Sequence, residues 1–175
     1  MFIQNNGKRI LAIDPGTRWM GVALLDNGKL VHHAVKVIAR GKSPQETLQR
    51  AKDVIVRLID ELEPQIVAVE RTFFGKSRNA AMLNALFDEI QTLAKRNKLA
   101  FVSYAPSTVK KFTCGNGWAS KKEVATVVVS KHPELKVFLT QDRAWKERFH
   151  QNMFDAVAIG MMAHRMSQKD VNSKA

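Results

Sequence analysis

The chain has a single cysteine among its 175 residues, and no apolar run approaches the roughly 20 residues of a membrane-spanning helix. One cysteine, Cys114, excludes an internal disulfide and fits a reducing compartment, so we expect a cytoplasmic protein. Residues 1–9 are polar and lack the apolar core of a signal peptide. Because no repeat and no Pro/Ser-rich linker interrupts the chain, we expect one domain over residues 1–166 and a disordered tail over 167–175.

Acidic residues are scarce relative to basic ones. The chain has 28 Lys and Arg against 16 Asp and Glu, which gives a formal net charge of +12 and a pI of about 10.1. Such a surface favours a polyanionic partner, and nucleic acid comes before an anionic membrane because no basic amphipathic helix stands out. A cationic protein with no nucleic-acid role has the same charge, so the choice depends on the chemistry of a site.

Apolar patterns predict an α/β domain. Asn27-Gly28, between two strand-like segments, indicates a hairpin turn. Residues 124–129 are β-branched and favour a strand by propensity, but Ser120 and Glu123 form a capping box, so we predict a helix there. An antiparallel start followed by alternating helices and strands predicts parallel pairing of the later strands. Strands are expected at residues 10–13, 21–25, 30–37, 66–69 and 100–104, and further helices at 43–62, 77–97 and 152–167.

Two of the predicted strands end in a carboxylate, Asp14 and Glu70. The carboxyl ends of strands form the functional crevice of open α/β sheets, and right-handed crossovers would place these two strands side by side. A third acid, Asp155, shares an apolar helix face with Ile159 and Met162, where a carboxylate is costly unless it is paired or bound to metal. Each acid also has an ordinary structural explanation, as a turn residue, a strand-end ion pair or a first-turn helix acid.

The three acids together favour a functional site. Clustered carboxylates raise one another's pKa, and a divalent cation removes that repulsion. Oxygen ligands suit Mg²⁺ or Mn²⁺, and two such ions about 3.5–4 Å apart activate water and stabilise the leaving oxygen of a phosphodiester. Acids, a basic surface and no thiol cluster therefore predict metal-dependent phosphodiester hydrolysis, with Asp14, Glu70 and Asp155 as catalytic residues.

The sequence resembles the RuvC Holliday-junction resolvases of the ribonuclease-H-like superfamily. The resemblance runs from about Arg9 to Arg165, and five blocks follow in the family's order. One Asp-Pro-Gly-Thr block would be weak evidence, but five in order are specific. The blocks are Ile13–Thr17 (IDPGT), Val69–Lys76 (VERTFFGK), Tyr104–Lys111 (YAPSTVKK), Gly115–Lys121 (GNGWASK) and Asp155–Ile159 (DAVAI).

The resemblance implies a ribonuclease-H-like mixed five-stranded sheet flanked by helices, in a homodimer that nicks two strands of like polarity at a four-way DNA junction. It implies two metal ions per active site, held by Asp14, Glu70 and Asp155. The family's fourth ligand is an Asp or His three residues before the last acid, and Asn152 stands there in this chain. Its amide oxygen is a neutral ligand of lower affinity. His150 lies nearby as a weaker substitute.

By the same resemblance, Phe73 is expected to insert at the junction centre, and Lys76 to bind DNA. Lys110 and Lys121 match two lysines near the scissile phosphate, and Lys121 is also a catalytic candidate. Besides its main apolar face, the 77–97 helix has a second, partly apolar stripe that is expected in the dimer interface. The stripe consists of Met82, Ala85, Glu89 and Leu93. Trp118 matches no role in the family, so it either contacts DNA or pins its loop.

Three alternatives stay open. A broader branched-DNA endonuclease of the same fold, such as a phage-type one, would also cut forks and flaps. A junction-binding protein without cleavage is compatible with Asn152. An actin-like ATPase or sugar kinase also begins with a strand and an Asp-x-Gly-Thr turn, but it needs a second lobe and a second phosphate loop, which this chain lacks. The metal stays open between Mg²⁺ and Mn²⁺, and a branch-migration motor stays open as a partner.

Overall fold

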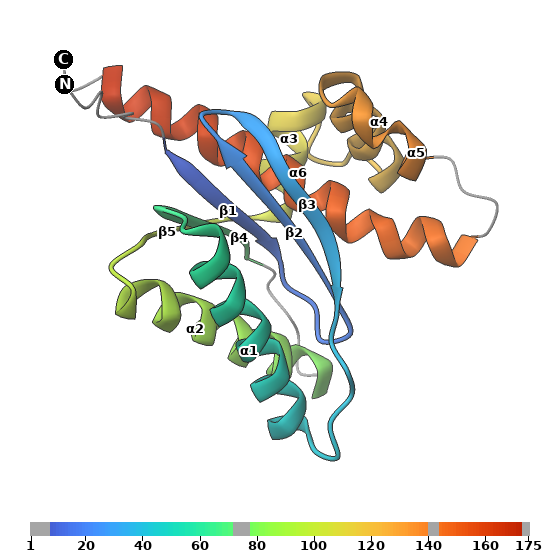
Figure 1. Ribbon diagram of the computed structural model, residues 1–175. Coiled ribbons are helices and arrows are strands. Elements are labelled where there is room, and N and C mark those ends of the chain that lie inside the picture. Colours follow the sequence, from blue (N-terminus) through green and yellow to red (C-terminus); the bar gives the residue numbers. More distant parts are fainter. Residues whose placement is uncertain (1–7, 72–77, 140–143, 173–175) are drawn as a thin grey trace.

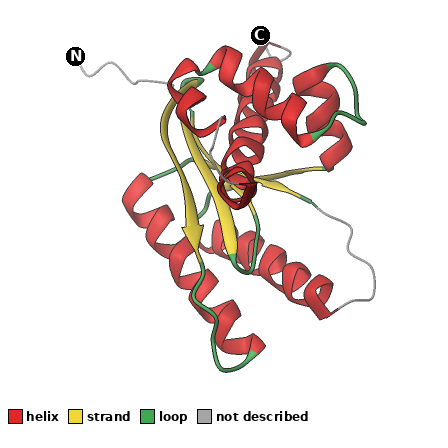
Figure 2. Cartoon of the chain, turned by 90° about the vertical axis from the view of Figure 1, so that its right-hand side faces the viewer, coloured by secondary structure: helices red, strands yellow, loops and turns green. Residues whose placement is uncertain are grey.

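The computed structural model describes residues 8–71, 78–139 and 144–172. A five-stranded sheet lies between two helical layers (Figure 1). Helices α1 (Pro44–Leu62) and α2 (Arg78–Arg96) cover one face, and α6 (Ala144–Asn172) crosses the other. The view turned by 90° separates the two helical layers on either side of the strands (Figure 2). The architecture is therefore a three-layer α/β/α sandwich.

The sheet is mixed, as predicted, in the order β3-β2-β1-β4-β5. β2 pairs with β1 and β3 in antiparallel fashion, whereas β4 pairs in parallel with β1 and β5. Ile13 pairs with Val69, so the next residues, Asp14 and Glu70, leave adjacent strands at the same edge. The strands are β1 (Arg9–Asp14), β2 (Trp19–Asp26), β3 (Lys29–Val37), β4 (Ile66–Glu70) and β5 (Ala100–Tyr104).

Local sequence signals explain several element boundaries. Asn27 and Gly28 both have positive φ, 53° and 82°, which is the backbone of the predicted two-residue hairpin turn. Ser43 caps α1 by accepting a hydrogen bond from the Glu46 amide at 3.1 Å. The capping box of Ser120 and Glu123 is present at the start of α4 (Lys121–Lys131), which confirms the helix predicted over residues 124–129.

Four features of the helical layers differ from the prediction. Helix α3 (Pro106–Cys114), the 3₁₀ turn Pro133–Leu135 and the short α5 (Lys136–Leu139) were not predicted. Pro106 occupies the first turn of α3 and begins a helix, because proline there gives up an amide that has no partner anyway. Helix α6 begins at Ala144 rather than at residue 152 and continues to Asn172.

The helical end of α6 corrects the expectation of a disordered tail from residue 167. Ser167 is buried, and its hydroxyl donates to the His164 carbonyl at 2.9 Å. The Ser167 carbonyl accepts a hydrogen bond from Lys8 Nζ at 3.4 Å. The Lys8 hydrogen bond attaches the helix end to the residue before β1, and such a tertiary contact could not be predicted from the polarity of the sequence.

The core has two halves because successive strand residues point to opposite faces of the sheet. Leu11 and Ile13 pack toward α1 and α2, whereas Ile10 and Ala12 pack toward α6. Gly21 of β2 lets α6 approach closely, since a side chain at this position would overlap the backbone carbonyl of Asn152. This approach places the middle of α6 over the edge of the sheet where β1 ends. None of the described helices is long and apolar enough to cross a membrane.

Candidate active site

Three carboxylates from distant parts of the chain meet at one edge of the sheet. Asp14 ends β1, Glu70 ends the neighbouring parallel strand β4, and Asp155 extends from α6, which packs across β1 and β2. The Asp155 and Glu70 charges both raise the pKa of Asp14, so the three groups lie within electrostatic reach of one another. Asp14 and Glu70 thus lie at the ends of paired strands with Asp155 near them, and their catalytic and metal-binding roles stay predictions.

Burial and mutual repulsion disfavour the ionised forms of these acids. Burial is the largest cause for each, and it raises the pKa of Asp14 well above its ordinary value, with Asp155 and then Glu70 adding to the effect. Burial and Asp155 raise the pKa of Glu70 from 4.5 to about 7. The pKa of Asp155 is also raised by burial. The cluster therefore lacks positive charge, which protons or a cation can supply.

Two lysines offset part of this deficit. Lys121 Nζ lies 3.5 Å from Asp155 Oδ2, and Lys121 lowers the pKa of all three acids. Lys110, in α3, lowers the pKa of Glu70 and Asp155. The Asp155 side chain is only 17% exposed, whereas Lys121 is 67% exposed and reaches in from solvent. Both predicted lysines thus face the carboxylates.

The sequence analysis missed Gln151, which contacts the same acid. Its amide nitrogen donates to Asp155 Oδ1 at 2.9 Å and lies 3.4 Å from the backbone carbonyl oxygen of Lys121. Gln151 thus links α6 to the first residue of α4. The available signal was the i,i+4 spacing of a glutamine and an aspartate on one helix. Such pairs are common on helix surfaces, so only the packing of α4 against α6 gives this one its importance.

The two candidates for the fourth ligand position have different surroundings. Asn152 is half-buried and lies three residues before Asp155, at the point where α6 crosses Gly21. The His150 ring packs against Phe138 and Phe149, with centroid distances of 4.8 and 5.1 Å. Burial and then Lys146 lower the pKa of His150, and the three carboxylates are not among the causes. His150 therefore belongs to an aromatic cluster, while Asn152 lies one helical turn before Asp155.

The donor set fits a hard divalent cation in chemistry, because it consists of carboxylate and amide oxygens. Within the described residues, however, no three Asp, Glu, His or Cys side chains are arranged so that they could hold one ion together. Gln151 and Lys121 each engage one oxygen of Asp155. An ion bound at Asp155 Oδ2 would replace the Lys121 contact, whereas the Gln151 hydrogen bond to Oδ1 would stay in place.

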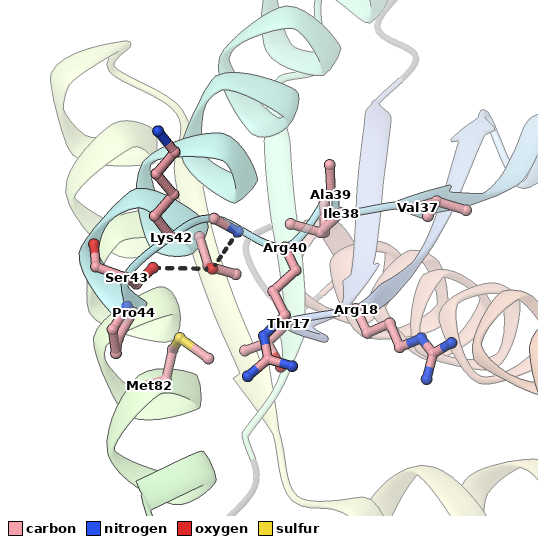
Figure 3. A pocket seen from close by; sticks show the side chains of 12 residues that line it. Thr17, Arg18, Val37, Ile38, Ala39, Arg40, Lys42, Ser43, Pro44 and Met82 are labelled. Carbon is pink, nitrogen blue, oxygen red and sulfur yellow. Dashed lines mark hydrogen bonds between the residues drawn. The ribbon is translucent and has the colours of Figure 1, made fainter.

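A basic cleft of about 860 Å³ opens beside the loop that follows Asp14 (Figure 3). Its walls include Arg18 of that loop, Arg40 and Lys42 of the segment before α1, and Met82 of α2. The segment before α1 is held in place, because Thr47 accepts a hydrogen bond from the Gly41 amide at 2.9 Å and donates to the Ser43 carbonyl at 3.1 Å. None of the described residues that line this cleft is acidic, so it adds cations and no further carboxylate.

Other predicted residues lie elsewhere. Phe73 and Lys76 fall outside the described residues. The second stripe of α2 is partly used within the chain, since Leu93 is buried in the core and Glu89 pairs with Lys52 of α1 at 2.9 Å. Met82 and Ala85 of that stripe remain half-buried in the single chain.

Residues 10–162 match the family model described as crossover junction endodeoxyribonuclease RuvC. The chain belongs to the RuvC family. It is 30% identical to the RuvC protein of Alkaliphilus metalliredigens over 160 residues, which cover 87% of this chain and 90% of that protein. Identity to the Fusobacterium nucleatum RuvC protein is also 30%, over 125 residues that cover 69% of this chain and 66% of the relative. That segment is about two thirds of the relative's length.

Solved structures of this family share the fold. The Thermus thermophilus RuvC structure superposes with a TM-score of 0.70 at 23% identity, covering 92% of this chain and 96% of that one. The same protein in complex with a Holliday junction substrate gives 0.69 at 21% identity, with the same coverage. The yeast mitochondrial Holliday junction resolvase Ydc2 gives 0.70 at 15% identity, covering 93% of this chain and 81% of that one. The ribonuclease-H-like fold expected from the sequence is confirmed.

Proposed function

We propose that this RuvC-family chain is a metal-dependent endonuclease that nicks two strands of like polarity at four-way DNA junctions by phosphodiester hydrolysis. The observation that carries the proposal is the convergence of Asp14, Glu70 and Asp155 beside Lys110 and Lys121, in a chain of net charge +12. The names of its relatives, which are crossover junction endodeoxyribonucleases, and the junction bound to one structural neighbour support the choice of substrate.

Asp14, Glu70 and Asp155 would hold Mg²⁺ or Mn²⁺, two ions in each site, with the Asn152 amide oxygen as a neutral fourth ligand. A bound ion supplies Lewis-acid activation of water and neutralises charge on the phosphate. The three carboxylates would keep the ion at the edge of the sheet. Gln151 orients the Asp155 carboxylate through its hydrogen bond at 2.9 Å. Because Asn152 carries no charge, we expect weaker metal binding than an acid or imidazole at this position would give.

Lys121 and Lys110 are suited to the phosphate backbone rather than to the metal. Each lies near the carboxylates, and the Lys121 ammonium is mostly open to solvent. A phosphodiester bound at the acids would therefore lie close to the ammonium groups of these two lysines. Their positive charge would offset the repulsion between the phosphate and the carboxylates of Asp155 and Glu70. Arg18, Arg40 and Lys42 extend the positive surface along the neighbouring cleft. Phe73 and Lys76 stay predicted DNA contacts.

We further propose a homodimer acting in the cytoplasm. Paired nicks need two active sites, and the part of the chain that the structure describes has one convergence of carboxylates. The half-buried Met82 and Ala85 on α2 are available for such an interface. Sedimentation of the protein with and without junction DNA measures the stoichiometry, and a monomer in both states would refute the dimer.

The test of the function is cleavage of a fixed four-way junction with Mg²⁺ or Mn²⁺, with the nicks mapped on all four strands. Paired nicks on strands of like polarity are expected, and Asp14→Asn should abolish them. Equal rates on four-way, three-way and flap substrates would indicate a broader branched-DNA nuclease. No nick with either metal, together with tight junction binding, would indicate a binding protein instead.

A further inference from the structure

Trp118 is almost fully open to solvent, with 93% of its surface exposed. The other two tryptophans have more contact with the protein, since Trp19 packs edge-on against Phe149 at 5.7 Å and Trp145 is 49% exposed. Of the two roles that the sequence left open, pinning the loop is excluded, because a pinning side chain would be buried. An exposed indole offers a large flat apolar surface that a partner can cover.

The loop that presents Trp118 is held in place by contacts of its own backbone. Gly115 ends α3 in the left-handed conformation, with φ of 76°. The Asn116 side chain accepts a hydrogen bond from the Trp118 amide at 3.0 Å, and the Asn116 carbonyl accepts one from the Ala119 amide at 3.2 Å. Ala119 is 1% exposed and anchors the end of the loop in the core. A partner would therefore meet a preorganised indole and would not have to order the loop.

This loop also connects the two lysines that face the carboxylates. Lys110 lies in the helix before it, and Lys121 is the first residue of the helix after it. Lys121 lies three positions after Trp118, so their Cα atoms are at most about 11 Å apart even in a fully extended chain. Lys121 Nζ is 3.5 Å from Asp155. A DNA strand with a phosphate at the carboxylates thus passes within a few nucleotides of the indole, since successive phosphates rise about 3.4 Å along a strand.

The surroundings of Trp118 select one class of partner. Lys111 and Lys122, both exposed, add positive charge to that of Lys110 and Lys121 on the two helices that flank the loop. A nucleic acid matches this combination, because its phosphates pair with lysines while an unpaired base covers the ring. We propose that Trp118 stacks on an unpaired nucleobase of the DNA strand that flanks the cut. This inference rests on the proposed function and adds a specific contact to it.

The first test uses Trp118 as its own reporter. A Trp19→Phe/Trp145→Phe variant leaves it as the only tryptophan, and its fluorescence is titrated with a four-way junction in EDTA. Stacking should quench the emission in a saturable manner. Binding measured by gel shift without any change in emission would overturn the proposal. Quenching that depends on protein concentration in the absence of DNA would also overturn it, because it would assign the indole to a protein contact.

The second test measures affinity. Trp118→Ala should weaken junction binding by about 5- to 150-fold, which corresponds to about 1–3 kcal/mol at 1.4 kcal/mol per tenfold. Trp118→Phe should retain most of the affinity, and Trp145→Ala, a matched exposed tryptophan on α6, should change it less than twofold. Equal affinity of Trp118→Ala and wild type would refute the stacking contact. If wild type cuts junctions normally while Trp118→Ala binds as wild type, only this inference fails; if wild type never cuts, the proposed function fails.

Discussion

Glu70→Gln should stabilise the metal-free protein above pH 7 while it abolishes cleavage. The Glu70 carboxylate is buried at the end of β4 and faces the charge of Asp155, and these two causes raise its pKa from 4.5 to about 7. The ionised form is therefore less favourable in the folded protein than in the unfolded chain. Glutamine has nearly the same shape and carries no charge, so it removes the repulsion and keeps the packing.

The sign and the size follow from proton linkage. Because the folded pKa is the higher one, the native state binds more protons between pH 4.5 and 7, and stability falls as the pH rises through this window. Above pH 7 the full penalty applies, about 3 kcal/mol at 1.36 kcal/mol per pKa unit. Glutamine avoids this penalty. For a domain of this size the gain at pH 8.5 is a rise in Tm of about 6–12 °C, and at pH 4 the gain vanishes.

The assay is thermal unfolding in EDTA from pH 4 to 8.5, followed by circular dichroism, for wild type, Glu70→Gln and the control Glu61→Gln. Glu61 is exposed on α1, so its substitution should change Tm little at any pH. Adding Mg²⁺ should stabilise wild type more than Glu70→Gln. A variant less stable than wild type at pH 8.5, or a gain that does not change with pH, would refute the reasoning from carboxylate repulsion.

Three further predictions concern DNA and metal binding. Asp14→Asn should keep junction affinity in gel shifts and abolish cleavage, and loss of both would mean that Asp14 is structural. Gln151→Ala should raise the Mg²⁺ or Mn²⁺ concentration for half-maximal cleavage by about 10- to 100-fold, because residues that orient a metal ligand have effects of this size. A calorimetric titration with the metal measures the affinity, and substitution of the exposed Gln49 by alanine is the control. Arg40→Ala should lower the slope of log affinity against log salt by about 0.9 if its guanidinium contacts one phosphate, and an unchanged slope would exclude the cleft from the DNA path.

Most of the secondary structure could be predicted from local sequence signals. The positive φ values at Asn27 and Gly28 require residues that tolerate them, so the Asn-Gly dipeptide alone predicted the hairpin turn. At α4 the capping box of Ser120 and Glu123 outweighed the β-branched run, because it satisfies amides that a helix start leaves unpaired. At Pro106 the local signal was ambiguous, since proline both ends and begins helices, and α3 was missed.

The sequence by itself determined the chemical identity of the site. Asp14, Glu70 and Asp155 stood out because each interrupts an apolar pattern, and that pattern is visible within one strand or one helix. The +12 charge and the five family blocks predicted the class of substrate in the same way. Each of these signals belongs to a single element or to the whole composition, so no distance between elements was needed.

Only the tertiary structure decided which neighbours surround those acids. The close passage of α6 over Gly21 brings Asp155 to the end of β1 and places Gln151 against the start of α4. In the folded chain His150 packs against Phe138, and Trp118 is exposed to solvent. Sequence periodicity reports one face of one element, whereas a site depends on the distances at which separate elements pack. For this reason the acids and the two lysines beside them were predictable, whereas the contact of Gln151 and the exposure of Trp118 were not.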